Sequence, residues 1–78
     1  MKARKVKWVE KDPNWFMRMI GGFDLCAIKW RNSCFDWWCS YCRNGVRVSL
    51  GGKAQTMAIA KARAERAYAR ICRMLEVK

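Results

Sequence analysis

Hydrophobic and polar residues alternate with a period of two in FDWWCSYCRNGVRVSL (residues 35–50), on both sides of Asn44-Gly45. Successive side chains of a β-strand point to opposite faces of a sheet, so this alternation predicts two strands. Asn-Gly favours a two-residue type I′ turn, because both turn residues need a positive φ. The pairing opposes Arg43 to Val46 and places an apolar set on one face. That set is Trp37, Cys39, Tyr41, Val46, Val48 and Leu50.

A second reversal is predicted one strand earlier, centred on Asn32-Ser33. On the outer face of the resulting sheet, Lys29 would meet Asp36, a favourable pair of opposite charges. Because two separate turns agree on one buried face, residues 23–50 are expected to form an antiparallel meander. The pairs expected on the buried face are Trp30 with Phe35, Ile28 with Trp37, and Cys26 with Cys39.

A helical period replaces the alternation after GGKAQT (residues 51–56), which is expected to end the sheet. Thr56 is a suitable N-cap, and the residues from there to about 75 include many Ala and Arg but no Gly or Pro. With about 100° of rotation per residue, one side of this helix is apolar and is expected to pack on the sheet. Its members are Met57, Ala60, Ala64, Ala67, Tyr68, Ile71, Met74 and Leu75.

The N-terminal segment, residues 1–22, is first basic and then apolar. VKWVE (residues 6–10) is compatible with a strand, and Asp12-Pro13 is typical of an N-cap followed by the first helical position. Residues 13–20 are therefore expected to form a short helix that ends at Gly21-Gly22, with an extra strand as the alternative. The apolar side chains would cover the outer sheet face or contact a second copy of the chain. A homodimer would form through Trp15, Phe16 and Met19 or through the outer sheet face.

These elements predict a single α+β domain over residues 1–78, with the sheet at 23–50 and the helix at 56–75. Three or four antiparallel strands would form a meander, packed on one face by the long C-terminal helix. With 78 residues, of which 53% are hydrophobic, the chain is large enough for one small core. No apolar run approaches the roughly 20 residues that span a bilayer. The N-terminus has no apolar stretch typical of a secretory signal, so a cytoplasmic location is expected.

The charge narrows the classes of partner. Seventeen Lys and Arg against six Asp and Glu give a net charge of +11, which favours anionic partners. Four arginines lie along one side of the helix over about 15 Å, enough to contact more than one phosphate. DNA or RNA is therefore the expected partner, and an acidic protein surface is the alternative because Arg also binds carboxylates. The expected binding residues are Arg63, Arg66, Arg70 and Arg73 on the helix, with Lys53, Lys61, Lys29, Arg47 and Trp38.

The residues favour a protein without enzymatic activity or a cofactor. The chain has no His, and its acidic residues are not spaced as a catalytic pair. The five Cys are expected to be reduced. Cys39 and Cys42 would point to opposite faces of a strand, and a tetrahedral thiolate site needs two further ligands. An irregular metal site that includes Cys34 and Cys72 stays open as an alternative.

Four stretches, IGGFDLCAIKW, FDWWCSY, RNGV and GGKAQTMAIAKARAERAYARI, resemble small phage and prophage proteins that combine three or four antiparallel strands with one Ala-rich C-terminal helix. The resemblance covers residues 20–71 and implies an inhibitor or adaptor that acts on host defence or a host enzyme in the host cytoplasm. GGKAQTMAIAKARAERAYA is also similar to double-stranded RNA-binding domains, with Lys53 and Lys61 near the helix start. The layout is similar to the DNA-binding modules of phage integrases, which read the major groove with their sheet.

Overall fold

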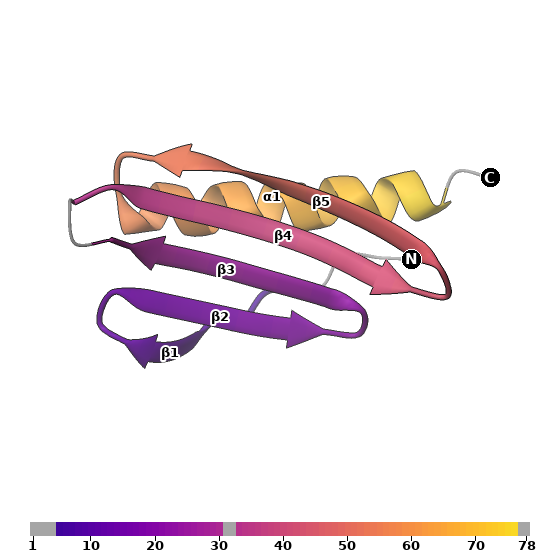
Figure 1. The fold of residues 1–78 in the computed structure, drawn as a ribbon, viewed down its shortest axis with the longest axis horizontal. Helices are drawn as coiled ribbons and strands as arrows, with labels where there is room; N and C mark the ends of the chain where they lie inside the picture. Colours follow the sequence, from indigo (N-terminus) through magenta and orange to yellow (C-terminus); the bar gives the residue numbers. More distant parts are fainter. Residues whose placement is uncertain (1–4, 31–32, 77–78) are drawn as a thin grey trace.

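The computed structural model describes residues 5–30 and 33–76 of the chain. In these residues, five antiparallel strands form one sheet in chain order: β1 (Val9–Asp12), β2 (Trp15–Ile20), β3 (Phe23–Lys29), β4 (Phe35–Arg43) and β5 (Val46–Ala54). The helix α1 (Met57–Glu76) lies against one face of β3, β4 and β5 (Figure 1). We call this the inner face and the opposite one the outer face. The predicted α+β meander is confirmed, but the described chain has more strands than the three or four expected.

The β4–β5 hairpin has the predicted register. Arg43 pairs with Val46, and the intervening Asn44 and Gly45 have φ angles of 52° and 79°. Both values are positive, as a type I′ turn requires. The side chains of β4 alternate as predicted: Trp37, Cys39 and Tyr41 belong to or pack against the core, and Trp38, Ser40 and Cys42 lie on the outer face.

β5 continues past Leu50, where the sheet was expected to end, because two glycines make room for two tryptophans. Gly52 lies opposite Trp37, and Gly51 lies opposite Trp38. A Cβ at Gly52 would lie 3.3 Å from the indole nitrogen of Trp37, and a Cβ at Gly51 would lie 3.1 Å from its carbonyl oxygen. The Gly-Gly pair is therefore part of the strand rather than its end.

The register between β3 and β4 differs by one residue from the prediction. Lys29 pairs with Phe35, so it does not meet Asp36 across the outer face. A slip of one residue moves every side chain to the other face of a sheet, and the expected inner pairs of this hairpin are therefore wrong. The residues of β3 on the inner face are Phe23, Leu25 and Ala27, and those on the outer face are Asp24, Cys26 and Ile28.

The cause of the slip lies in the loop between these strands. The Trp30 N–H donates to the Cys34 carbonyl at 2.8 Å, and the Ser33 N–H donates to the Trp30 carbonyl at 3.0 Å. Ser33 has a φ of 64°, a left-handed backbone conformation. This conformation is uncommon for Ser, so the sequence does not predict it. The other half of the predicted turn, Asn32, lies outside the described residues. These bonds remove Trp30 from the strand, and its indole N–H instead donates to Asp36 at 2.6 Å.

Residues 15–20 form β2 rather than a short helix. The Asp12 carboxylate accepts a hydrogen bond from the Asn14 N–H at 2.8 Å, so the side chain expected to cap a helix stabilises the turn after β1. Gly21, with a φ of 58°, provides the turn into β3. In the strand, Phe16 and Met17 pack on opposite faces of the sheet beside β3. Alternation divides these apolar side chains between the two sheet faces, and Met19 is the one β2 residue that is exposed.

α1 begins where predicted, and the core lies beneath it. The Thr56 hydroxyl oxygen accepts the N–H of Ile59 at 3.1 Å, as expected of an N-cap. The ring of Phe23 lies 4.7 Å, centre to centre, from both Tyr41 and Tyr68. Met74, expected on the buried stripe, is 52% exposed. The buried core consists of Val6, Phe23, Leu25, Cys39, Tyr41, Ala64, Ala67, Tyr68, Ile71 and Cys72.

Candidate binding site

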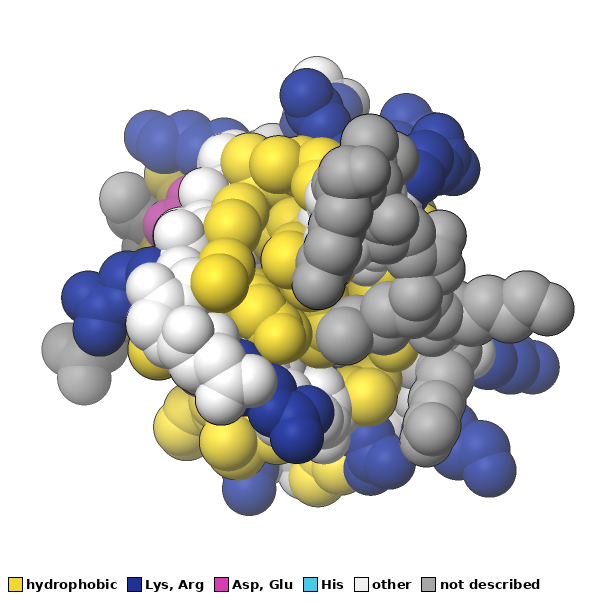
Figure 2. All heavy atoms as spheres, turned by 90° about the vertical axis from the view of Figure 1, so that its right-hand side faces the viewer, with side chains coloured by type: hydrophobic (Ala, Val, Ile, Leu, Met, Phe, Trp, Pro, Cys, Tyr) yellow, Lys and Arg dark blue, Asp and Glu magenta, His cyan; other side chains and the backbone are white. Residues whose placement is uncertain are grey.

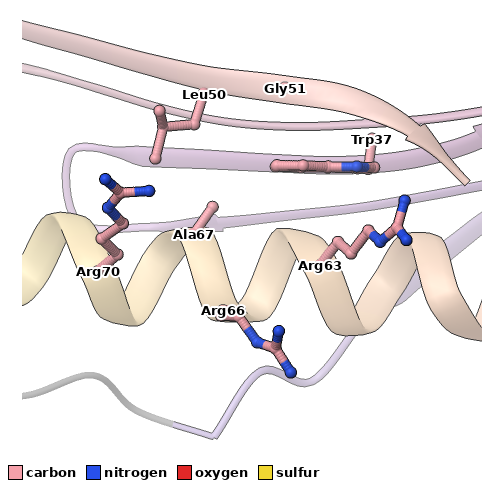
Figure 3. A pocket seen from close by; sticks show the side chains of 7 residues that line it. All are labelled: Trp37, Leu50, Gly51, Arg63, Arg66, Ala67 and Arg70. Carbon is pink, nitrogen blue, oxygen red and sulfur yellow. The ribbon is translucent and has the colours of Figure 1, made fainter.

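A groove of about 290 Å³ lies between α1 and the β4–β5 side of the sheet (Figure 3). In Figure 3, Arg63 and Arg70 extend from α1 toward the strands, and Arg66 points away from them. None of the residues that line the groove is acidic, so its positive charge is not neutralised from within. The lining residues are Trp37, Leu50, Gly51, Arg63, Arg66, Ala67 and Arg70.

The helical period explains why two arginines flank one groove. Arg63, Ala67 and Arg70 are separated by four and three residues, which places them on one flank of α1. This β5 flank (Arg63, Ala67 and Arg70) faces the edge of the sheet. Nη1 of Arg63 donates to the Lys53 carbonyl of β5 at 2.6 Å. The bond anchors one guanidinium at the edge of the sheet, where its remaining donors can serve a ligand.

Trp37 forms the apolar wall of the groove on the sheet side. The indole lies against Gly52, where a Cβ would come within 3.4 Å of two of its ring carbons. Its N–H is shielded from solvent and has no hydrogen-bond partner among the described residues. A buried donor without a partner costs about 1–3 kcal/mol, so this indole N–H is a small cost to the stability of the fold.

The opposite flank of α1 is occupied by other parts of the chain. Nζ of Lys61 lies 3.4 Å from the ring centre of Phe16, a short cation–π contact. The Trp8 indole N–H donates to a Glu65 carboxylate oxygen at 2.8 Å, and Val6 is buried in the core. This β2 flank (Lys61 and Glu65) therefore makes its contacts within the molecule. Lys61, predicted as a binding residue, does not join the groove.

The other predicted binding residues fall on different surfaces. Arg73 is exposed and lies about one turn beyond Arg70, outside the groove lining. Trp38 and Arg47 lie on the outer face, as predicted, and Lys53 lies there too, although the sheet was expected to end before this residue. Lys29 does not share that face: its strand position is opposite Phe35, and its Nζ lies 5.8 Å from that ring centre. Lys29 therefore does not belong to the binding surface that was predicted on the outer face of the sheet.

The predicted contact residues for a homodimer are also separated. Trp15 and Met19 lie on the outer face, and Met19 is 72% exposed. Phe16 lies on the inner face beneath Lys61. Strand alternation thus prevents the three residues expected to meet a second copy from forming one surface.

Two buried thiols are held in the protonated form. Burial raises the pKa of Cys39 to about 12, and the neighbouring Cys72 and Asp24 add to the effect. Burial also raises the pKa of Cys26 to about 11, against a lowering contribution from a hydrogen bond with Trp15. Within residues 5–30 and 33–75, no three Cys, Asp or Glu side chains come together as metal ligands.

Sequence reasoning identified the arginines but missed the other wall of the groove. Trp37 and Leu50 were assigned to the core, and Gly51 was assigned to a loop. Extending the β5 register by two residues would have placed Gly51 and Gly52 opposite the two tryptophans. The sequence signal for the groove was therefore the pairing of two bulky tryptophans with two glycines, which have no side chain.

Comparison with known proteins found no matching family model, no matching curated protein and no matching solved structure. The resemblance to small phage proteins stays a prediction. In the described part of the chain, no helix combines the length and apolar character needed to cross a membrane.

Proposed function

We propose that this protein is a non-enzymatic nucleic-acid-binding module that contacts phosphates through the arginine row of α1 (Arg63, Arg66, Arg70 and Arg73). The observation that supports this most directly is the groove lining, where three of these arginines occur without an acidic residue. Guanidinium groups bind phosphate oxygens through paired hydrogen bonds. Arg63 is already held at the sheet edge by the Lys53 carbonyl, which reduces the ordering that binding requires.

The length and charge of the arginine row suit a phosphate backbone. Arg63 and Arg73 are ten residues apart, or about 15 Å along the axis, which corresponds to about four phosphates of one strand. The net charge of +11 raises the local concentration of any polyanion. Figure 2 views the end of the molecule at the right of Figure 1, and Lys and Arg side chains surround the visible face.

The test compares a triple variant with a control of equal charge. Arg63→Gln, Arg66→Gln and Arg70→Gln together should weaken binding of a fluorescent oligonucleotide and reduce its dependence on salt. The slope of log K against log salt should fall by about 0.9 for each duplex phosphate contact removed. Binding is measured by anisotropy at several salt concentrations, with single-stranded and duplex DNA and RNA.

The control variant is Lys5→Gln, Lys7→Gln and Lys11→Gln, which removes the same charge from exposed residues on and before β1. It should retain most of the affinity. Equal weakening in both variants would show that net charge alone attracts the oligonucleotide. No binding by the unmodified protein at low salt would disprove the proposal.

An acidic protein target, recognised by a small inhibitor or adaptor, is the second candidate function. It is favoured by the apolar part of the groove lining, Trp37 and Leu50, which a phosphate backbone does not need. Interfaces between proteins combine such apolar pockets with arginine. A pulldown with the triple variant beside the unmodified protein would show whether the same arginines hold a protein partner.

A further inference from the structure

The backbone of β5 has a free edge beside the groove. β5 is last in the strand order, and within the described residues its strand partner is β4 alone. In an antiparallel ladder, alternate residues direct their N–H and C=O groups toward or away from the neighbouring strand. The type I′ turn makes Arg43 and Val46 a hydrogen-bonded pair. Counting from that pair, the residues with edge-directed backbone groups are Arg47, Ser49, Gly51 and Lys53.

A side-chain contact agrees with this count. Arg63 donates to the carbonyl of Lys53 at 2.6 Å, so that carbonyl points away from β4 and out of the sheet edge. The same parity directs the backbone groups of Arg47, Ser49 and Gly51 outward. β5 pairs with β4 from Val46 to Ala54 without a register shift, so the free edge is regular.

Positive charge flanks this edge on both sides. Arg63 and Arg70 extend toward it from α1 on the inner side (Figure 3). Arg47 and Lys53 are exposed on the outer side. A second β5 docked on this edge would bring like charges together, and charged side chains are a known means of preventing such pairing. An acidic strand would meet cations on both of its faces.

We propose that the β5 edge accepts an extended acidic segment of a partner protein as an additional strand. Backbone groups of Arg47, Ser49 and Gly51 would pair with the segment, and its carboxylates would meet Arg63 and Arg70. Side chains on the inner side of the segment would also contact the apolar wall formed by Trp37 and Leu50. This inference goes beyond nucleic-acid binding, and because both ligands use Arg63 and Arg70, they should compete.

The backbone chemistry of the edge favours a peptide over a nucleic acid. Each outward-facing residue offers one donor and one acceptor at regular spacing along the strand. Phosphate groups accept hydrogen bonds but do not donate them, so phosphate contacts would give the carbonyls of Arg47, Ser49 and Gly51 no donor. An extended peptide supplies donors and acceptors in the alternation that these groups require.

The test measures amide hydrogen exchange with a defined probe. The probe is a capped peptide of alternating Glu and Val, nine residues long to match β5. Its binding should slow exchange of the amides of Arg47, Ser49 and Gly51 by about ten-fold or more. A peptide of the same sequence with N-methylated backbone nitrogens keeps the charge but loses the donors. It should bind at least about ten-fold more weakly and protect none of the three amides.

Three results would overturn the inference. One is peptide binding without protection of these amides, and another is equal binding of the N-methylated peptide. The third is protection of the same amides in the concentrated protein alone, which would indicate a second copy at the edge. An oligonucleotide should compete with the peptide without protecting these amides.

A variant separates this inference from the proposed function. Ser49→Pro removes an edge-directed N–H and no bond to β4, and proline is tolerated at such positions of edge strands. It should lose peptide binding and retain oligonucleotide binding, while Ser49→Ala retains both.

If Ser49→Pro still binds the peptide, the inference fails and the proposal of nucleic-acid binding is unaffected. If the unmodified protein protects its edge amides with peptide but binds no oligonucleotide, the proposed function fails and the inference stands. The exchange experiment on the unmodified protein decides the question even if Ser49→Pro does not fold.

Discussion

Both flanks of α1 include basic residues, but the surroundings of the two flanks differ. On the β2 flank, Lys61 contacts Phe16 and Glu65 accepts a bond from Trp8. On the β5 flank, Arg63 donates to the Lys53 carbonyl at the edge of the sheet, and none of the residues that line the groove beside it is acidic. Lys61 is therefore engaged by an aromatic ring of the sheet, whereas Arg70 and the remaining donors of Arg63 are able to meet a ligand.

The difference shows why a charge pattern on a helix does not by itself locate a binding surface. Lys61 and Arg63 are two residues apart on α1, and both were predicted to bind a partner. Their contacts depend on the part of the sheet that lies opposite each of them. Lys61 lies over an aromatic ring of β2, whereas Arg63 lies at the edge of β5. The N-terminal segment around Val6 then shields the β2 flank further.

The largest expected effect on the free energy of unfolding comes from truncating two leucines to Ala, one in the core and one in the groove. Leu25 of β3 is fully buried, whereas Leu50 of β5 lines the groove. Leu25→Ala should lower the free energy of unfolding by about 2–5 kcal/mol, and Leu50→Ala by about 1–2 kcal/mol, because part of its surface is already in contact with solvent. Urea unfolding followed by circular dichroism measures both. Equal losses would contradict the open character of the groove.

A smaller effect should appear at alkaline pH, because Cys39 is buried under α1 and Cys42 is exposed on the outer face. The pKa of Cys39 is about 12 when folded, against an ordinary value of 9.0. Above pH 9 the unfolded thiol loses its proton and the folded thiol keeps it, so rising pH favours unfolding. The free energy of unfolding should fall by up to about 1.4 kcal/mol per pH unit until the folded thiol ionises.

Urea unfolding between pH 8 and 11 checks this dependence. Cys39→Ala should flatten the decline, with the remainder due in part to Cys26, whose pKa is also raised, to about 11. Cys42→Ala, at an exposed position on the same strand, should leave the decline unchanged. An unchanged decline in Cys39→Ala would show that this thiol is accessible to water.

The smallest expected effect is the difference in stability between two variants, each of which removes one charge from one flank of α1. Lys61→Gln loses the contact with Phe16 and should cost about 0.5–1 kcal/mol. Arg70→Gln should cost nothing or stabilise slightly, because it relieves repulsion in a chain of net charge +11. The melting temperatures of the two variants at low salt would reveal the difference. Destabilisation of Arg70→Gln would show that its guanidinium is already engaged by the fold.

The sequence predicted those parts of the fold that depend on neighbouring residues. Asn44-Gly45 determines the β4–β5 register through two backbone angles, and Thr56 determines the start of α1 through one hydrogen bond. The β3–β4 register could not be predicted in the same way, because Ser33 adopts a positive φ without being Gly or Asn. Residues 15–20 are apolar at nearly every position, so they have no period that separates strand from helix.

The candidate site was predictable to the extent that it depends on the helix. The period of α1 was sufficient to group Arg63 with Arg70. The groove also needs Trp37, which lies 20 residues before Met57, the first residue of α1. Its indole fits because Gly52 has no side chain. This dependence becomes visible only when the β5 register is extended across the hairpin, and the pattern of α1 does not contain it.

The order of the strands has a consequence for synthesis of the chain. Each strand of this meander can pair with the one made just before it, so the sheet can assemble as the polypeptide leaves the ribosome. The helix emerges after all five strands, and until it docks, Phe23, Leu25 and Tyr41 face water. A nascent chain stalled before Met57 would present this aromatic surface to every neighbour, and we expect it to need a chaperone or to aggregate.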